Sequence, residues 1–489
     1  MSEQVTFPRR ERTGILFGLS WPQVITVGLI IVVIALTASQ GGLVPGLVVA
    51  SVLSAPLTVA LVSFKDTPLI VYGWRAGKFA LRKFNGQSRW KIDPHESRPL
   101  WGVELPGGLG SVEVWQSGLA TPLPGVAVAY DPHGVVNRHR GTFSVTALVD
   151  SKAFELLSES EQRDLVNGFS RALGAWTRDE TIARVTLMER TIPAPPAAIE
   201  QHWEQVAAER NVDRSSWAAQ VYQQALEQVH TTSMRHESYV TLTFGVSAAK
   251  QLIRDAGGGR AGMIHVAAMA AVSAGPLLER AGLPIMNWLN EREWAALART
   301  AFVPNEAALL NDRDGIAPET AIPTAIDEYA DHLVADGVWH QVLWVSEWPI
   351  SETRAGFLDG IVFAPGVQKS FTITAAPVRL EAALKQIHAA EQAILADVAQ
   401  RARTDRRPNA MAERELADLQ ERRRALEKGH GDYKFRGLVT ISAPSLDALN
   451  SARATILSAS AHANLELRVL WHQQAAAFCS ARLPVGRGA

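Results

Sequence analysis

The sequence predicts a two-helix transmembrane hairpin at the N-terminus, followed by a cytoplasmic α+β region with ferredoxin-like antiparallel or mixed sheets and a helical hairpin insert. Two observations support this fold class. From Thr13 to Phe64 no side chain is ionisable, although 20% of the chain is charged. After this stretch, alternating β-branched segments and amphipathic helical segments follow one another in an order that repeats, which is typical of α+β domains.

The uncharged stretch contains two apolar blocks, at residues 21–39 and 43–64. Each is long enough to cross a hydrocarbon core of about 30 Å as a helix. The link Gln40-Gly41-Gly42 allows only a tight reversal. Cations flank both blocks while the turn has none, so the positive-inside rule predicts a protein of the cell membrane with both termini cytoplasmic. These cations are Arg9, Arg10, Arg12, Lys65, Arg75, Lys78, Arg82 and Lys83.

Two other interpretations of the blocks stay open. The first block could be a cleaved signal peptide ending near Thr37-Ala38-Ser39, but a secreted domain does not need the second block. Both blocks could instead be core helices of a soluble fold, although core helices rarely lack every charge over this length.

Small residues recur every four positions in the second block and would form one ridge along a helix. In lipid, helices associate through close packing of such ridges. The ridge therefore predicts a helix-packing surface, whose partner is either the first span near Gly28 or a helix of another protein. Its members are Gly42, Gly46, Ala50, Ser54 and Thr58.

Residues 72–90 are basic and aromatic, which suits a segment lying on an anionic inner leaflet. An amphipathic helix folded onto the next domain is the alternative. Residues 94–110 are rich in proline and glycine and read as a linker. We divide the chain into residues 1–90 (hairpin and juxtamembrane segment), 91–260 (first α+β domain), 261–376 (helical and α+β middle region), 377–430 (helical hairpin) and 431–489 (C-terminal βαβ part completing a second α+β half).

The first α+β domain is expected to be a sheet with helices on one face. Ser158 and Glu161 have the spacing of a capping box at the start of a helix. Strands are predicted at 142–150, 181–192 and 237–246, and helices at 158–176, 196–209 and 215–230.

The middle and C-terminal regions repeat the order of strand, helices, strand, helix and strand. Helices are predicted at 263–281, 290–300 and 446–460, the last two capped by Asn290 and Ser445. Strands are predicted at 340–348, 369–378, 435–443 and 465–471. The charged residues of 377–430 indicate a solvated helical hairpin, with a partner-binding arm as the alternative.

Composition and motifs exclude several function classes. The formal net charge is −1, so the whole protein has no electrostatic attraction to nucleic acid. The single cysteine, Cys479, excludes an internal disulfide and fits a reducing cytoplasm as a small apolar filler. Val367 and Gln368 separate Gly366 from Lys369-Ser370, unlike a Walker loop. The histidines lack metal-site spacing. We therefore predict no catalytic, cofactor-binding or metal-binding residues, and no enzyme.

The arrangement resembles a PrgI-type membrane hairpin fused to the N-terminal, non-ATPase part of TrbE/CagE-type secretion ATPases, a class found in actinobacterial conjugative elements. The resemblance covers nearly the whole chain. The segments that carry it are Phe7-Pro8-Arg9, Tyr72-Gly73-Trp74-Arg75, Val345-Ser346-Glu347-Trp348-Pro349, Lys428-Gly429-His430 and Ala481-Arg482-Leu483-Pro484-Val485-Gly486.

The resemblance implies a structural component of a type IV secretion system for conjugative DNA transfer. In that family the last of these segments leads into the motor domain, and this sequence stops there. It therefore implies a scaffold on the bilayer that docks a separate P-loop ATPase and other channel subunits, with a homo-oligomer as an option and no sequence-specific nucleic acid. Two alternatives are a membrane-anchored enzyme using dispersed residues (His340, Glu347 and Asp359) and a nucleic-acid-binding accessory protein using Arg401–Arg407 and Arg422–Arg424.

Overall fold

Two stretches of chain with the same order of elements build the protein, and the first runs from residue 112 to residue 302. Its strands are β5 (Val112–Trp115), β6 (Gly134–Asn137), β7 (Thr142–Val149), β8 (Ile182–Pro193), β9 (Met234–Gly245) and β10 (Ile285–Trp288). Its helices are α4 (Glu159–Arg178), α5 (Pro196–Glu209), α6 (Trp217–Val229), α7 (Lys250–Asp255), α8 (Gly259–Arg280) and α9 (Glu291–Phe302), with a 3₁₀ turn at Phe154–Leu156. Strand β9 lies between β7 and β8, and β10 pairs with the end of β7.

The second stretch runs from residue 325 to residue 482 and follows the 3₁₀ helix Pro304–Ala308. Its strands are β11 (Ala325–Glu328), β12 (Leu333–Ala335), β13 (Val338–Glu347), β15 (Gln368–Val378), β16 (Asp432–Ala443) and β17 (Glu466–Val469). Its helices are α10 (Asp359–Val362), α11 (Leu380–Arg403), α12 (Ala410–Glu427), α13 (Leu446–His462) and α14 (Gln474–Arg482). Strand β16 lies between β13 and β15, and β17 pairs with the end of β13, as in the first half.

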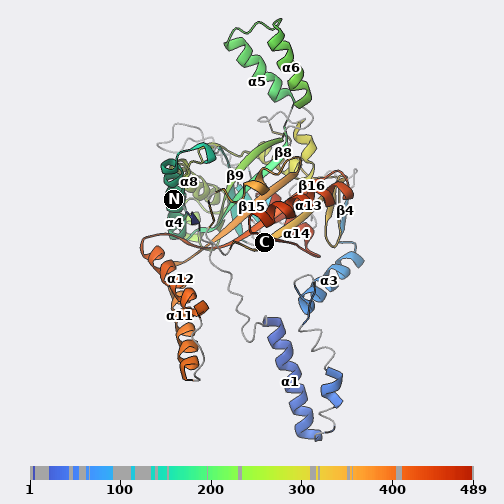
Figure 1. Ribbon diagram of the computed structural model, residues 1–489, viewed down its shortest axis with the longest axis vertical. Helices are drawn as coiled ribbons and strands as arrows, with labels where there is room; N and C mark the ends of the chain where they lie inside the picture. The colour runs from blue at the N-terminus through green and yellow to red at the C-terminus, as the bar shows by residue number, and fades with distance from the viewer. Residues whose placement is uncertain are drawn as a thin grey trace.

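The two halves share one large antiparallel sheet because β8 pairs with β15, from Val185 opposite Ala375 to Thr191 opposite Lys369. Within the described chain this sheet has 13 strands, in the order β4-β11-β12-β13-β16-β15-β8-β9-β7-β6-β5 with β10 and β17 beside it, where β4 is Arg89–Lys91. The protein is therefore an α+β fold (Figure 1). The computed structural model describes residues 4–5, 21–42, 44, 48–53, 62–64, 67–91, 112–115, 134–137, 141–150, 154–194, 196–229, 234–308, 315–317, 320–349, 353–354, 356–403 and 410–486.

A pair of helices interrupts each half between its second and third long strands. Because β8 and β15 are antiparallel, the pairs α5–α6 and α11–α12 leave the sheet at opposite ends (Figure 1). The charged helices expected within 377–430 are α11 and α12.

Helices cover both faces of the sheet. Within 91–260, α4 and α7 pack on one face, as expected for the first α+β domain, and the cover of the other face comes from α9 and α14, which lie outside that range. Side chains of directly paired residues point to the same side of a sheet. On one side, strand residues such as Val145 and Val439 lie in cores with α4, α8 and α13. On the other side, Met188 and Val342 lie in a core with α9 and α14, which we call the α9/α14 face. Apolar residues on both sides of the central strands require this second cover.

Local capping signals predicted helix starts correctly. The backbone N–H of Glu161 donates to the Ser158 hydroxyl at 3.4 Å, and the Ser158 N–H donates back to the Glu161 carboxylate at 2.9 Å. Asn290 forms a second capping box with Glu293. Ser445 accepts from the N–H of Ala448 at 3.2 Å at the start of α13.

The chain is attached to the α+β body on both sides of its apolar N-terminal segment. Strand β1 (Gln4–Val5) pairs with β14 (Thr353–Arg354). Helix α1 (Trp21–Gly41) follows, and a small hairpin of β2 (Ser63–Phe64) and β3 (Thr67–Pro68) leads into α3 (Leu69–Phe84), which packs on the body.

Candidate membrane-proximal site

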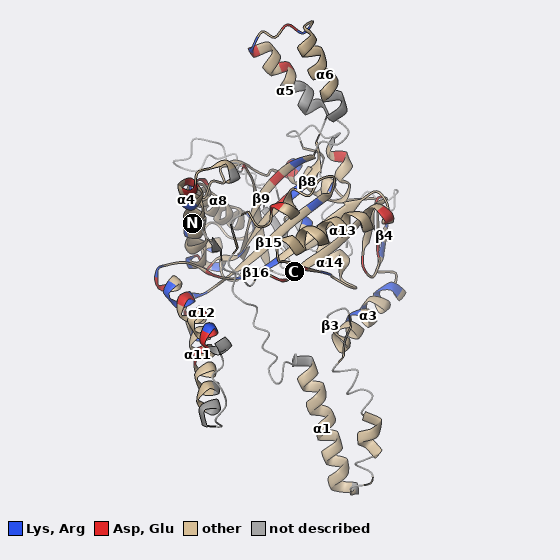
Figure 2. Ribbon diagram, viewed as in Figure 1, with Lys and Arg blue, Asp and Glu red and all other residues tan. Residues whose placement is uncertain are grey.

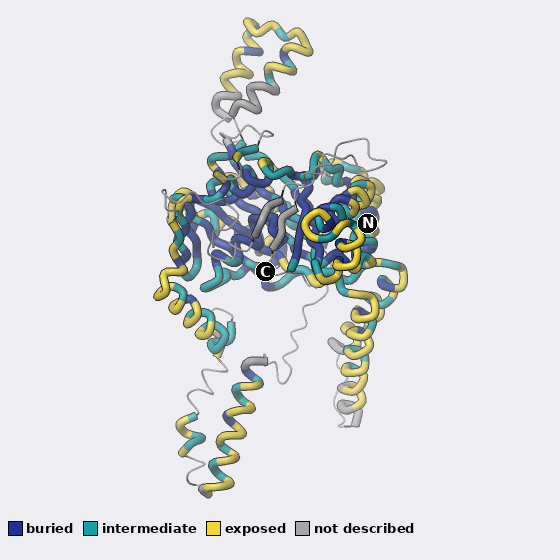
Figure 3. The backbone as a smooth tube through the Cα atoms, turned by 180° about the vertical axis from the view of Figure 1, so that it is seen from behind, coloured by how far each residue is buried: buried dark blue, intermediate teal, exposed yellow. Residues whose placement is uncertain are grey.

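Helix α1 is an uncharged apolar helix that stands away from the body. At 21 residues it is about 31 Å long, close to the thickness of a bilayer core. Its apolar window Gln23–Gln40 is only 11% buried, and Leu29 is 66% exposed. Figure 2 shows no charged residue on it, and Figure 3 shows its largely exposed surface. Such a continuous apolar surface is unusual unless a membrane or a partner covers it.

A second helix, α8, is also long and apolar enough to cross a membrane. It differs from α1 because 44% of it is buried and it packs against α4 and β7. At Gly262 an added Cβ would lie 2.2 Å from the carbonyl oxygen of Ile253, so glycine permits this close approach between α7 and α8. We interpret α8 as a core helix of the body.

The predicted second span is described only in part. Residues 48–53, which include Ala50 of the predicted ridge, are helical, and Gly42 lies in the turn after α1 with φ +85°. Gly46, Ser54 and Thr58 lie outside the described residues, as do the linker 94–110 and the cations Arg9, Arg10, Arg12 and Lys65. The predicted end at Phe64 is wrong, because Ser63 and Phe64 form β2 instead.

Helix α3 docks one of its faces on the C-terminal part of the body. Phe79 is buried, with its ring centroid 5.3 Å from that of His472, and Tyr72 contacts the same ring at 5.2 Å. Arg82 donates to the carbonyl oxygen of His472 at 3.2 Å. Helix α3 is therefore an amphipathic helix folded onto the body, as in the alternative, but it docks on the second half and not on the next domain along the chain.

A buried carboxylate fixes the same face of α3. Glu328 of β11 is fully buried, accepts from the N–H of Ala475 at 3.0 Å, and forms an ion pair with Arg82 at 3.1 Å. Burial raises the pKa of Glu328, and the Arg82 charge and the Ala475 hydrogen bond oppose that rise. Arg82 is thus a tether between α3 and the second half of the sheet.

The opposite face of α3 is exposed and combines aromatic, aliphatic and cationic groups. Trp74 is 66% exposed, Leu81 62% and Phe84 90%. The Lys78 ammonium lies 4.8 Å from the Trp74 ring centroid. Spacings of four, three and three residues place Trp74, Lys78, Leu81 and Phe84 on one stripe. Large apolar residues beside lysines are the composition of helices that lie in a membrane interface.

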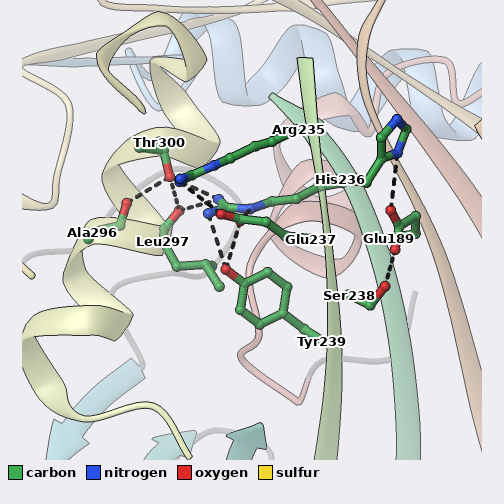
Figure 4. A network of polar contacts seen from close by, with 10 residues as sticks. Glu189, Arg235, His236, Glu237, Ser238, Tyr239, Ala296, Leu297 and Thr300 are labelled. Carbon is green, nitrogen blue, oxygen red and sulfur yellow. Dashed lines mark hydrogen bonds and ion pairs between the residues drawn. The ribbon is translucent and has the colours of Figure 1, made fainter. Parts of the chain in front are cut away.

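A buried polar network lies on the α9/α14 face where the halves meet (Figure 4). Arg190 donates to Glu237 at 2.5 Å and to the Thr300 hydroxyl at 2.8 Å, and Tyr239 donates to Glu237 at 2.8 Å. Arg235 forms a second ion pair with Glu237 at 2.8 Å. Burial alone would raise the pKa of Glu237, but the charges of Arg190 and Arg235 outweigh it and lower that pKa. The network joins two strands to α9.

The dispersed residues of the enzyme alternative do not converge. His340 is buried on the α9/α14 face, where its ring nitrogens contact the Ser442 hydroxyl at 2.8 Å and the Phe302 carbonyl oxygen at 2.9 Å. Glu347 lies at the other end of the same strand, about 23 Å along it. Asp359 begins α10, which packs with α13 on the opposite face. The described residues contain no cluster of three metal-ligating side chains.

Lys369, which belongs to the segment compared above with a Walker loop, lies in strand β15. Its ammonium donates to the carbonyl oxygens of Ala364 at 3.0 Å and Val367 at 3.4 Å. Burial lowers the pKa of Lys369 to about 8. The amine therefore has a structural role at the start of β15.

Two arginines of the nucleic-acid alternative, Arg422 and Arg423, are paired with carboxylates. Arg422 forms an ion pair with Asp432 at 2.6 Å, and Arg423 pairs with Glu391. Residues 401–403 end α11, and 404–407 lie outside the described chain. Paired guanidinium groups leave less charge for phosphates.

Sequence reasoning missed Glu328, the anchor of α3, and the Arg190–Glu237 network. Neither a known family model nor a curated protein matches the chain.

Proposed function

We propose that this chain is a membrane-anchored structural component of a type IV secretion system, which holds a separate ATPase at the cytoplasmic face. One observation carries the membrane part of the proposal. Helix α1 exposes an uncharged apolar surface, and the chain is attached to one body both before and after it. The secretion part rests on the sequence resemblance.

A two-helix hairpin accounts for this attachment. An odd number of crossings would place Gln4 and Arg82 on opposite sides of the bilayer, yet both contact the same α+β body. Two crossings, at about 21–39 and 43–64, return the chain to the side it left. The flanking cations put that side in the cytoplasm. The exposed stripe of α3 then lies on the inner leaflet, while its other face holds the body.

The body suits a scaffold. The order β10-β7-β9-β8 in one half and β17-β13-β16-β15 in the other agrees with a ferredoxin-like arrangement of each half. The pair α5–α6 projects from the end of the body opposite to α1 (Figure 1). Its Trp217 is 78% exposed and Tyr222 50% exposed, so we assign ATPase docking to this membrane-distal pair.

The first test is membrane insertion. We expect the intact chain to sediment with membranes and to resist alkaline carbonate, whereas Leu29→Arg should release a large fraction, because arginine at the centre of a span costs about 2.5–3.5 kcal/mol. Leu29→Phe keeps the apolar character and should behave as wild type. Recovery of the wild-type chain in the high-speed supernatant without detergent would contradict the proposal.

The second test is docking. The full chain in mild detergent should co-elute with the P-loop ATPase encoded beside it, and Trp217→Asp should weaken the complex about tenfold or more, because aromatic anchors dominate interfaces. Leu156→Asp replaces a residue that is 86% exposed on the 3₁₀ turn Phe154–Leu156 and should bind normally. Failure of the wild-type chain to co-elute at several salt concentrations would refute docking without affecting the membrane result.

A further inference from the structure

We propose that the protein binds a small inorganic anion in its interior, at the guanidinium group of Arg482. Arg482 is the last residue of α14 and is fully buried. Among the described residues, none of its three side-chain nitrogens has a hydrogen-bond partner. A guanidinium group stays charged and carries five N–H donors. Enclosing it without an acceptor or a counter-charge is strongly unfavourable, so the group requires a negatively charged partner.

Contacts of α14 place this guanidinium group over the centre of the sheet. Helix α14 packs on β13, β15 and β16. The Thr372 hydroxyl donates to the carbonyl oxygen of Ala481 at 2.5 Å, which fixes the end of α14 on β15. Two residues earlier on the same face, Ser370 pairs with Arg190 of β8 and with Thr440 of β16. The Arg190 charge lowers the pKa of Arg482, and the Arg482 charge lowers the pKa of His340, so both side chains lie near this guanidinium group.

Two hydroxyl groups, on the paired residues Ser370 and Thr440, are buried without a hydrogen bond to any described residue, as the Arg482 guanidinium group is. Ser370 and Thr440 are both fully buried, and neither hydroxyl has a hydrogen-bond partner in the part of the chain that the structure describes. Buried polar groups without partners are uncommon in folded proteins. Here a guanidinium group and two hydroxyl groups from paired strands lie on one face of the sheet, and each of them is a hydrogen-bond donor for an anion.

The charge in this region calls for an anion rather than a neutral acceptor. Arg190 and Arg235 share Glu237, at 2.5 and 2.8 Å, which leaves no carboxylate for Arg482 among the described residues around it. The ring nitrogens of His340 contact Ser442 and Phe302, so they are already used. Because the donors are fully buried, the ligand is small: a halide, or an oxyanion that the planar guanidinium group can hold through two hydrogen bonds.

The anion would hold the C-terminal segment on the joint between the halves. Beyond Arg482, the chain continues over the same face, where Arg184 donates to the carbonyl oxygen of Gly486 at 2.9 Å. A Cβ at Gly486 would lie 2.6 Å from the Thr243 hydroxyl, so the segment lies close against β9. Strands β8 and β15, which join the halves, lie beneath it.

The test is thermal unfolding of the full chain in neutral detergent, with chloride or phosphate raised at constant ionic strength against gluconate. For the wild type we expect a saturating rise in melting temperature of about 3 °C for an anion taken to about a hundred times its Kd. Arg482→Met should lose this rise and keep only the general salt effect. A response to chloride alone identifies a halide site, and a response to phosphate alone identifies an oxyanion site.

Two matched variants locate the site. Ser370→Ala should reduce the rise, whereas Thr374→Val, on the same face of the same strand, should leave it unchanged. An equal rise in wild type and Arg482→Met, or no rise in the wild type, would overturn the proposal. If Arg482→Met does not fold, crystals of the wild type grown with bromide, and others grown with selenate, decide. An anomalous peak within hydrogen-bond distance of Arg482 is expected in one of them, and a protein carboxylate or a water molecule there in both refutes the proposal.

Discussion

Glu237→Gln is expected to lower the free energy of unfolding by about 3–5 kcal/mol, because it leaves buried arginines without their counter-charge. Arg190 is fully buried, donates to Glu237 at 2.5 Å, and lies directly opposite it on the neighbouring strand. The Glu237 carboxylate also accepts from Tyr239 at 2.8 Å. A glutamine amide keeps the size of the side chain but removes the charge that offsets the burial of Arg190.

Urea unfolding of the full chain in detergent, followed by far-ultraviolet circular dichroism, measures this loss. Glu180→Gln is the matched control, since its pair with Arg379 spans 3.7 Å and both side chains are more than half exposed. Such a surface pair contributes about 0–1 kcal/mol. Replacing the buried pair together, as Arg190→Met with Glu237→Leu, should cost less than Glu237→Gln alone. A loss below 1 kcal/mol for Glu237→Gln would mean that water or another acidic group compensates Arg190.

Local signals predicted much of the secondary structure. Helix α4 and helix α9 begin at the capping boxes of Ser158 and Asn290 because the cap and its third-residue partner lie close together in the chain. The apolar helix α1 could also be predicted from the sequence, because a long run of uncharged apolar residues is recognised without knowing the rest of the fold.

The pairing of strands that lie far apart in the chain could not be predicted from the sequence. Alternation along β8 and β15 marks each as a strand, but nothing in either segment states that Val185 lies opposite Ala375. The cover of the second face by α14 was missed because its residues, among them Cys479, are small and apolar without a clear period. An alanine-rich segment after the last strand is therefore a signal worth testing as a helix.

The candidate site shows the same limit. The basic and aromatic stretch after the apolar blocks predicted an interfacial or amphipathic helix, and α3 has both a docked and an exposed face. The ion pair that anchors α3 could not be predicted, because Glu328 lies far along the chain from Arg82. Arg482 did carry a weak signal: it is the only charged residue between Gln473 and Val485, and such a residue is buried only with a partner.

Acid is expected to destabilise the protein through His340. Burial, followed by the nearby charge of Arg482, lowers the pKa of His340 to about 3, although its hydrogen bond to the Phe302 carbonyl opposes the shift. In the unfolded chain the imidazole titrates near pH 6.5. Between these values the unfolded state binds a proton that the folded state does not, so stability falls as the pH falls. From pH 6.5 to pH 4 this one group should remove about 3 kcal/mol.

The measurement is the difference between wild type and His340→Gln in urea unfolding at each pH, because other groups also titrate in this range. His340→Gln removes the titrating ring, and the pH dependence of its stability should be flatter by one proton. His462→Gln, at the exposed end of α13, is the control and should keep the wild-type slope. Equal slopes for wild type and His340→Gln would show that the folded state takes up the proton at His340. In that case the Ser442 hydroxyl, which donates to Nδ1 of the neutral ring, would rotate and accept from the imidazolium instead, while the other ring nitrogen keeps its bond to the Phe302 carbonyl oxygen.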